Sequence, residues 1–108
     1  MSTRLPGPKY KKVFDRGRSL KGRLLVGWYA RSDDADRQAG VVVSKKSLRL
    51  AVARNRAKRL VREAYRLLVA EGAMPAGVEW VFVIRRAIEG AKCVEVKAEL
   101  ARLASRVG

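Results

Sequence analysis

The sequence predicts one α+β or α/β domain in which helices pack on a single sheet. Three observations support this class. The chain has 108 residues, the length of one domain, and its hydrophobic content of 48% is sufficient for one core. Amphipathic helical patterns and apolar strand-like runs follow one another in the order helix, strands, helix, strand, helix. No internal repeat or low-complexity tract interrupts them, so we expect one sheet with its helices around it.

The N-terminal stretch is expected to contain an arm and a short helix. Residues 1–8, MSTRLPGP, combine proline, glycine and polar residues, which predicts a flexible arm ahead of a single domain over residues 9–108. The next stretch, KYKKVFDRG, places three apolar side chains at helical spacing and then a glycine that can end the helix. A helix this short needs packing against the rest of the domain to be stable.

Two strands are expected next. LLVGWYA, residues 24–30, is rich in strand-forming residues, and AGVVVSKK, residues 39–46, predicts a returning strand. The polar stretch RSDDADRQ between them predicts a turn, so the two strands should form an antiparallel hairpin. Asp33, Asp34 and Asp36 of this turn are expected to be solvated rather than to form a site.

Residues 51–70 form the clearest predicted helix. At about 100° per residue, apolar side chains occupy an arc roughly 100° wide, and cations occupy an opposite arc roughly 140° wide. The predicted core face consists of Ala53, Ala57, Leu60, Ala64, Leu67 and Leu68, with Val61 and Tyr65 at its border. The predicted cationic face consists of Arg54, Asn55, Lys58, Arg59, Arg62 and Arg66.

The C-terminal third predicts a strand and a second amphipathic helix. EGAMPAG, residues 71–77, should end the basic helix, because its glycines and proline do not continue one. VEWVFVIRR, residues 78–86, is mostly apolar, which indicates a buried strand. The last helix is expected to bury one face, formed by Val96, Leu100, Leu103, Ala104 and Val107.

Charge is the dominant compositional feature. Twenty-five Lys and Arg against ten Asp and Glu give a net charge of +15, which indicates a polyanionic partner. No apolar stretch approaches the roughly 20 residues that span a bilayer, and the N-terminus lacks an apolar signal core, so we expect a cytoplasmic protein without membrane contact. Cys93 is the only cysteine, which excludes an internal disulfide and suits a reducing compartment.

The residue types argue against catalysis by the polypeptide. The chain has no histidine, and its serines and acids form no recognisable nucleophile, metal or phosphate-loop arrangement. We therefore expect no catalytic residue and no metal site. The charged side chains on one face of the basic helix are almost all positive, which predicts nucleic-acid binding. Aromatic residues on the strands beside this helix favour single-stranded RNA or DNA over a duplex.

Specific motifs narrow this expectation. ARNRAKRLVREAYR, residues 53–66, closely resembles the RNR motif of the bacterial ribonuclease P protein component. VVVSKK resembles the strand that precedes this motif in the family, and YKKVFDRGRSLKG resembles the family's N-terminal helix. The resemblance covers roughly residues 9–105. It implies a two-layer α+β sandwich with a four-stranded sheet and an uncommon left-handed βαβ crossover.

The resemblance also implies a division of labour. In this family a large RNA subunit performs the Mg²⁺-dependent hydrolysis that removes the 5′ leader from precursor tRNA, and the small basic protein assists. The implied partners are therefore the catalytic RNA and precursor tRNA, with Mg²⁺ bound mainly by RNA and no protein partner. A structural ribosomal protein and a sequence-specific DNA regulator are the alternatives.

By motif, the resemblance assigns residues to two surfaces. The leader cleft would include Tyr10, Phe14 and Trp28, although Tyr10 and Phe14 are equally compatible with core packing. Two departures from the family are visible: KKSLRLAV lacks the usual glycine, so Ser47 becomes an alternative cap of a longer helix, and LLVGW carries Trp28 where Tyr or Phe is commoner. The RNA-binding surface would comprise Arg54, Asn55, Arg56, Lys58, Arg59, Arg62 and Arg66, with Ser44, Lys45 and Lys46 at its edge.

Overall fold

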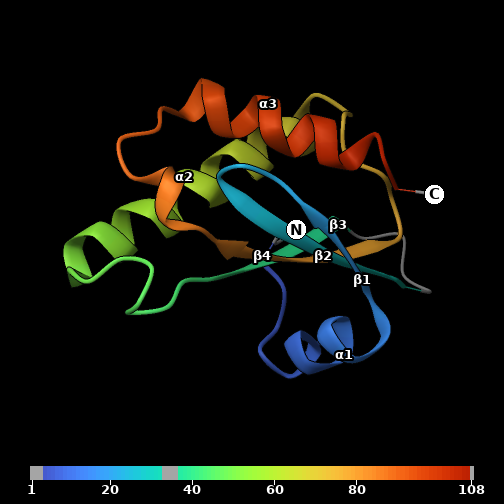
Figure 1. The fold of residues 1–108 in the computed structure, drawn as a ribbon. Helices are drawn as coiled ribbons and strands as arrows, with labels where there is room; N and C mark the ends of the chain where they lie inside the picture. Colours follow the sequence, from blue (N-terminus) through green and yellow to red (C-terminus); the bar gives the residue numbers. More distant parts are fainter. Residues whose placement is uncertain (1–3, 33–36, 108) are drawn as a thin grey trace.

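The computed structural model describes residues 4–32 and 37–107, which form one sheet with helices on both faces. Helices α2 and α3 lie together on one face, and α1 lies on the other (Figure 1). This arrangement confirms the α+β class and the single sheet of four strands, whereas α1 adds a layer to the two-layer sandwich that the resemblance implied. In chain order the elements are α1 (Pro8–Arg16), β1 (Arg18–Lys21), β2 (Leu25–Arg31), β3 (Arg37–Val42), α2 (Ala51–Ala70), β4 (Val78–Ile84), the 3-10 helix η1 (Arg86–Ile88) and α3 (Cys93–Ala104).

The sheet has the strand order β1-β2-β4-β3, and this order contradicts the predicted hairpin. Strand β4 lies between β2 and β3, antiparallel to β2 and parallel to β3. All residues of β4 except Val83 are buried, and a central position shields this apolar strand on both edges as well as both faces. The strand predicted over residues 39–46 is β3, which ends at Val42. The unit β3–α2–β4 is thus a crossover between neighbouring parallel strands.

Strand β1 was not expected from the sequence. It pairs antiparallel with β2, with Ser19 opposite Trp28 and Leu20 opposite Gly27. Only Leu20 of its four residues is shielded from solvent, so the strand has no apolar run to reveal it. Its place at the edge of the sheet explains this composition, because an edge strand needs partners on one side only.

The main core lies between the sheet and helices α2 and α3. Trp80 and Phe82 of β4 stack with ring centroids 5.3 Å apart, and Tyr65 of α2 packs on Phe82. Tyr65 and Val61 are fully buried rather than at the border of the helix's core face, and burial raises the pKa of the Tyr65 hydroxyl. On α3 the predicted buried face is confirmed for Val96, Leu100, Leu103 and Ala104, whereas Val107 lies beyond the helix and is half-buried.

The expectation of a separate arm over residues 1–8 is wrong for residues 4–8. Leu5 is buried and its backbone N–H donates to the carbonyl of Ala39 at 3.0 Å, and Arg4 forms a parallel bridge with the same residue. Pro8 already begins α1. The reason is that Leu5 packs into the same buried cluster as Val13 of α1, together with Ala30 and Val81 of the sheet. Residues 1–3 lie outside the described part of the chain.

Helix α2 begins three residues later than a Ser47 cap would imply. Leu50 is its N-cap residue, and Ser47 instead belongs to the preceding turn, where its backbone N–H donates to Ser44 Oγ at 3.1 Å. The helix ends as predicted, with Gly72 at a φ of 73° after the last turn. Of the predicted turn, Asp33, Asp34 and Asp36 lie outside the described residues. Within the described part, no helix is long and apolar enough to cross a membrane.

Candidate RNA interface

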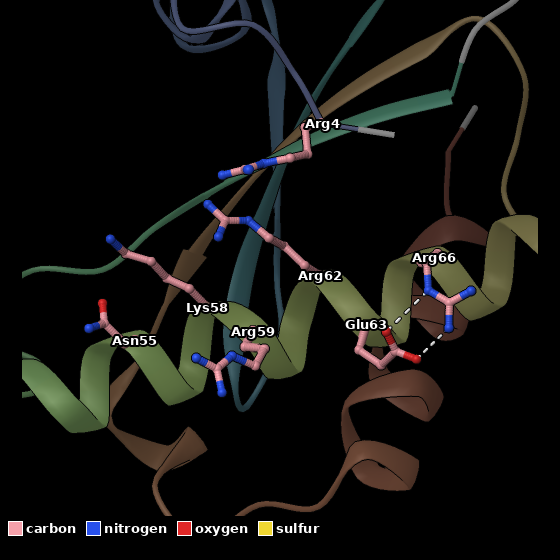
Figure 2. A pocket seen from close by; sticks show the side chains of 7 residues that line it. All are labelled: Arg4, Asn55, Lys58, Arg59, Arg62, Glu63 and Arg66. Carbon is pink, nitrogen blue, oxygen red and sulfur yellow. Dashed lines mark hydrogen bonds and ion pairs between the residues drawn. The ribbon is translucent and has the colours of Figure 1, made fainter. Parts of the chain in front are cut away.

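The cationic side of α2 borders a wide cleft whose opposite wall is formed by Arg4 (Figure 2). The cleft has a volume of about 570 Å³. Lys58 and Arg62 extend from α2 toward the side on which Arg4 lies (Figure 2). Residues three and four apart share one helix face, which is why the sequence periodicity found this surface. The lining residues are Arg4, Asn55, Lys58, Arg59, Arg62, Glu63 and Arg66.

The charges of this cleft are almost all positive. Glu63 is the only acid among the described residues that line it, and it pairs with Arg66 one turn along the helix. The hydrogen bond from Arg66 lowers the pKa of Glu63, so the carboxylate neutralises Arg66 in place. In contrast, Lys58, Arg59 and Arg62 have no carboxylate partner in residues 4–32 and 37–107. These three cations are therefore available to an external anion.

Arg4 is the lining cation that the sequence did not reveal. It reaches the cleft because burial of Leu5 and the bridge to Ala39 hold the N-terminal segment beside β3. The only signal in the sequence was a leucine between Arg4 and a proline, inside a stretch whose composition otherwise predicts a flexible arm. The cleft thus joins a helix and an N-terminal segment about fifty residues apart in the chain.

Two residues of the predicted motif lie away from the cleft. Arg54 donates from Nη1 to the carbonyl oxygens of Leu48 and Arg49, at 3.0 and 2.9 Å, and so holds the chain that enters α2. Arg56 points to another side of the helix, where it lines an apolar groove with Leu50 and Val52. Hence Arg54 has a structural role, and Arg56 contacts the apolar groove instead of the cationic cleft.

The edge residues Ser44, Lys45 and Lys46 lie in the turn between β3 and α2. Both lysines are exposed, and neither lines the cleft. Ser44 Oγ lies 3.0 Å from Ser47 Oγ and also accepts the backbone N–H of Ser47, so this serine stabilises the turn. The structure places all three beside the N-terminal end of α2 rather than on its cationic face.

The three aromatic residues predicted for the leader cleft come together on the sheet face opposite α2. Phe14 of α1 and Trp28 of β2 meet edge to face, with ring centroids 5.5 Å apart. Tyr10 and Trp28 are half-buried, and Phe14 is 37% exposed. Tyr10 packs directly over Gly40, where any Cβ would collide with its ring. Tyr10 therefore has a packing role, and Phe14 and Trp28 present ring surface to solvent.

A buried carboxylate fixes α1 above this aromatic surface. Glu79 of β4 has only 2% of its side chain exposed, and each of its oxygens lies 2.9 Å from an ammonium of α1, that of Lys9 or Lys12. Burial alone raises the pKa of Glu79, but the hydrogen bonds and charges of Lys12 and Lys9 outweigh this effect, and the net pKa lies below its usual 4.5. The ion pairs thus hold the helix that carries Tyr10 and Phe14.

This arrangement predicts a specific loss of stability in acid. Because the pKa of Glu79 is lower in the folded chain than in the unfolded chain, its contribution is complete above the unfolded pKa and disappears as the pH falls through the folded value. We expect Glu79→Gln to lower the free energy of unfolding at pH 7 by about 1–2 kcal/mol and by less at an acidic pH well below the usual 4.5 of the carboxyl. Urea unfolding at both pH values measures this difference. The variant Glu63→Gln, at an exposed position, is the control. If Glu79→Gln loses the same free energy of unfolding at both pH values, the ion pairs of Glu79 are not the cause of the loss.

Comparisons with known proteins identify the family of the chain. The family model described as Ribonuclease P matches residues 5–108. The chain is 37% identical over 97 residues to the ribonuclease P protein component of Pelotomaculum thermopropionicum, covering 90% of this chain and 84% of that one. It is 34% identical over 100 residues to that of Clostridium botulinum strain Langeland, covering 93% and 88%. The solved ribonuclease P protein of Thermotoga maritima superimposes with a TM-score of 0.81 at 28% identity, covering 99% of both chains. The chain therefore belongs to the ribonuclease P protein family.

Proposed function

We propose that this member of the ribonuclease P protein family binds the catalytic RNA through α2 and the 5′ leader of precursor tRNA through the aromatic surface of α1 and β2. The carrying observation is the cleft between Arg4 and α2, where Lys58, Arg59 and Arg62 lack carboxylate partners among the described residues. An RNA backbone supplies the regularly spaced anions that such a surface can bind. The two surfaces lie on opposite faces of the sheet, so one domain can contact both RNAs (Figure 1).

In this proposal the RNA subunit, with its bound Mg²⁺, performs the hydrolysis. The chain contains no histidine, and its described residues include no cluster of three or more acidic or cysteine side chains able to hold a metal ion. The protein contributes positive charge and stacking surface instead, and it acts in the cytoplasm where tRNA is processed. This division of labour explains why like charges are retained along α2: the RNA supplies the missing counter-charge.

A reconstitution tests the proposed function directly. Purified protein is mixed with ribonuclease P RNA and 5′-labelled precursor tRNA at low Mg²⁺, and release of the leader is followed by gel electrophoresis. We expect cleavage with both subunits and none with the protein alone. Cleavage by RNA-free protein would place the chemistry in the polypeptide. Failure to restore cleavage, with both subunits intact and folded, would remove the proposal.

Substitution of Trp28 tests the leader surface separately. Stacking of a base on an aromatic side chain contributes about 1–3 kcal/mol, so we expect Trp28→Ala to weaken holoenzyme binding to precursor tRNA by about 5- to 150-fold. Binding of mature tRNA, which lacks the leader, serves as the control and should change much less. Single-stranded leader RNA should also quench tryptophan emission of the unaltered chain but not of Trp28→Phe. Trp80 is fully buried and stays in both proteins. Equal losses for both tRNAs would exclude a leader contact at Trp28.

A further inference from the structure

Helix α2 borders a second concave surface, which we call the α2 groove. It lies between the first turns of α2 and the chain that connects η1 to α3, and its volume is about 200 Å³. Leu48 and Ile88 are buried beneath it, and Leu50, Val52, Arg56 and Leu60 belong to its lining on the helix side. The groove is therefore mainly apolar, in contrast to the cationic cleft on the adjacent side of the same helix.

Two apolar side chains at the rim of the α2 groove are exposed to an unusual extent. Leu50 is 71% exposed and Val52 is 79% exposed. Single exposed apolar residues are common on proteins, but here two of them adjoin a concave apolar surface. Such a combination is typical of a surface that a partner covers.

The position of Leu50 strengthens this interpretation. It is the N-cap residue of α2, a position that favours Ser, Thr, Asp or Asn because their side chains accept a free backbone N–H. Leu50 supplies no such hydrogen bond, so the helix lacks a side-chain cap at its first turn. Helices α1 and α3 also begin without a side-chain cap, so the feature that sets Leu50 apart is its large exposed apolar side chain. The exposed leucine is thus better explained by a contact outside the chain than by the stability of α2.

The charges around the groove identify the occupant. Arg56 lines it, and the exposed cations Arg49, Arg86 and Lys92 adjoin its lining residues along the chain, whereas Glu89 is the only described acid in the lining. A second copy of this chain, at +15, would bring like charges together. An unpaired RNA base combines an apolar ring face with a negative backbone, and arginine guanidinium planes stack on such rings. We propose that the α2 groove receives an unpaired base of the ribonuclease P RNA, with Arg56 stacked on it.

The proposal rests on the proposed function, since it requires α2 to face the RNA subunit. It gives the same helix two recognition modes: phosphates bind on the side of Lys58 and Arg62, and a base binds on the side of Val52 and Arg56. The first mode depends on salt through counterion release, and the second does not. This difference allows the two contacts to be measured independently.

The test compares matched serine substitutions in the full-length chain. Kd for ribonuclease P RNA, without tRNA, is measured over a range of salt concentrations for Leu50→Ser, Val52→Ser, the double variant Leu50→Ser/Val52→Ser and the control Val94→Ser. Val94 is 69% exposed on α3 and lies outside the groove lining. Loss of a stacked base predicts about fivefold or greater weakening for the double variant Leu50→Ser/Val52→Ser, with an unchanged salt slope. Val94→Ser should bind as the unaltered chain does.

The thermal stability of Leu50→Ser shows whether weaker RNA binding by this variant results from misfolding. Serine is a favourable N-cap residue, so this variant should melt about 4 °C or more above the unaltered chain while binding RNA more weakly. Unchanged RNA affinity of the double variant would overturn the groove proposal, and so would equal weakening by Val94→Ser. A groove that closes a dimer would appear as self-association lost in the double variant, which would also overturn it. If Lys58 and Arg62 variants likewise leave affinity unchanged, the proposed function itself fails.

Discussion

Triple replacement of Lys58, Arg59 and Arg62 by alanine should weaken binding of ribonuclease P RNA by about 100-fold at 0.15 M salt. Each lost phosphate contact should lower the slope of log Kd against log salt by about 0.7–0.9, or about 2–2.7 for the three. These side chains line the cleft and have no carboxylate partner among the described residues, so their removal breaks no ion pair within the chain. The fold should therefore remain as stable or become slightly more so, because cations four residues apart repel. Filter binding at several salt concentrations and thermal unfolding measure both effects.

A charge-matched control separates local contact from general attraction. Lys21, Arg23 and Arg106 are exposed and lie outside the cleft, on or beside β1 and after α3. Their triple replacement by alanine lowers the net charge by the same amount. We expect a much smaller loss of affinity and little change in slope. If both triple variants lose the same affinity, the protein attracts RNA by net charge alone and the cleft is not the interface. Arg54 is unsuitable for this test because it also holds the chain that enters α2.

Replacement of Glu99 by alanine should lower the free energy of unfolding by about 3–5 kcal/mol, a large part of the stability of a domain this size. Glu99 lies on α3 with 2% exposure, and its carboxylate accepts the backbone N–H groups of Arg23, Leu24 and Leu25 at 2.8–3.0 Å. A Cβ on Gly22 would lie 2.6 Å from Oε2, so the turn between β1 and β2 closes tightly around this side chain. Without the carboxylate, the N–H groups of Leu24 and Leu25 remain buried without an acceptor.

Two further variants define the cause of this loss. Glu99→Gln keeps one carbonyl oxygen and should lose less stability than Glu99→Ala, because part of the acceptor set remains. Glu95→Ala removes an exposed carboxylate from the first turn of α3 and should cost about 0.3–1 kcal/mol. Denaturant unfolding of the three variants ranks them. A loss for Glu99→Ala as small as that for Glu95→Ala would show that water replaces the carboxylate at the β1–β2 turn.

Elements defined by residues close together in the chain were predicted from the sequence, and elements defined by contacts with distant segments were not. The bounds of α2 were predicted correctly, since the apolar and cationic stripes of a helix arise from residues three and four apart. The apolar run at residues 78–84 likewise indicated a buried strand. Strand β1 was missed because Leu20 is its only partly shielded residue, and the neighbouring β2 supplies its hydrogen bonds.

The candidate site was predicted only in part, because helical spacing reveals residues that share one helix face but not contacts between distant segments. Lys58, Arg59 and Arg62 were found because one helix face carries them, and the structure places all three on one cleft. Arg4 was missed because it reaches the cleft only through the burial of Leu5 on a distant part of the sheet. Arg56 was grouped with the other cations by motif, although its position on the helix directs it into the α2 groove.

The sequence by itself determined the family, the three α-helices and the strongly positive charge of α2, because motif spacing and helical periodicity are properties of neighbouring residues. Only the tertiary structure decided the pairing of β4 between β2 and β3, which replaced the predicted hairpin. It also decided that Arg4 faces Arg62 and that Phe14 meets Trp28. The physical reason is that strand order and these contacts minimise exposed apolar surface and unpaired backbone groups over the whole chain, which no local pattern records.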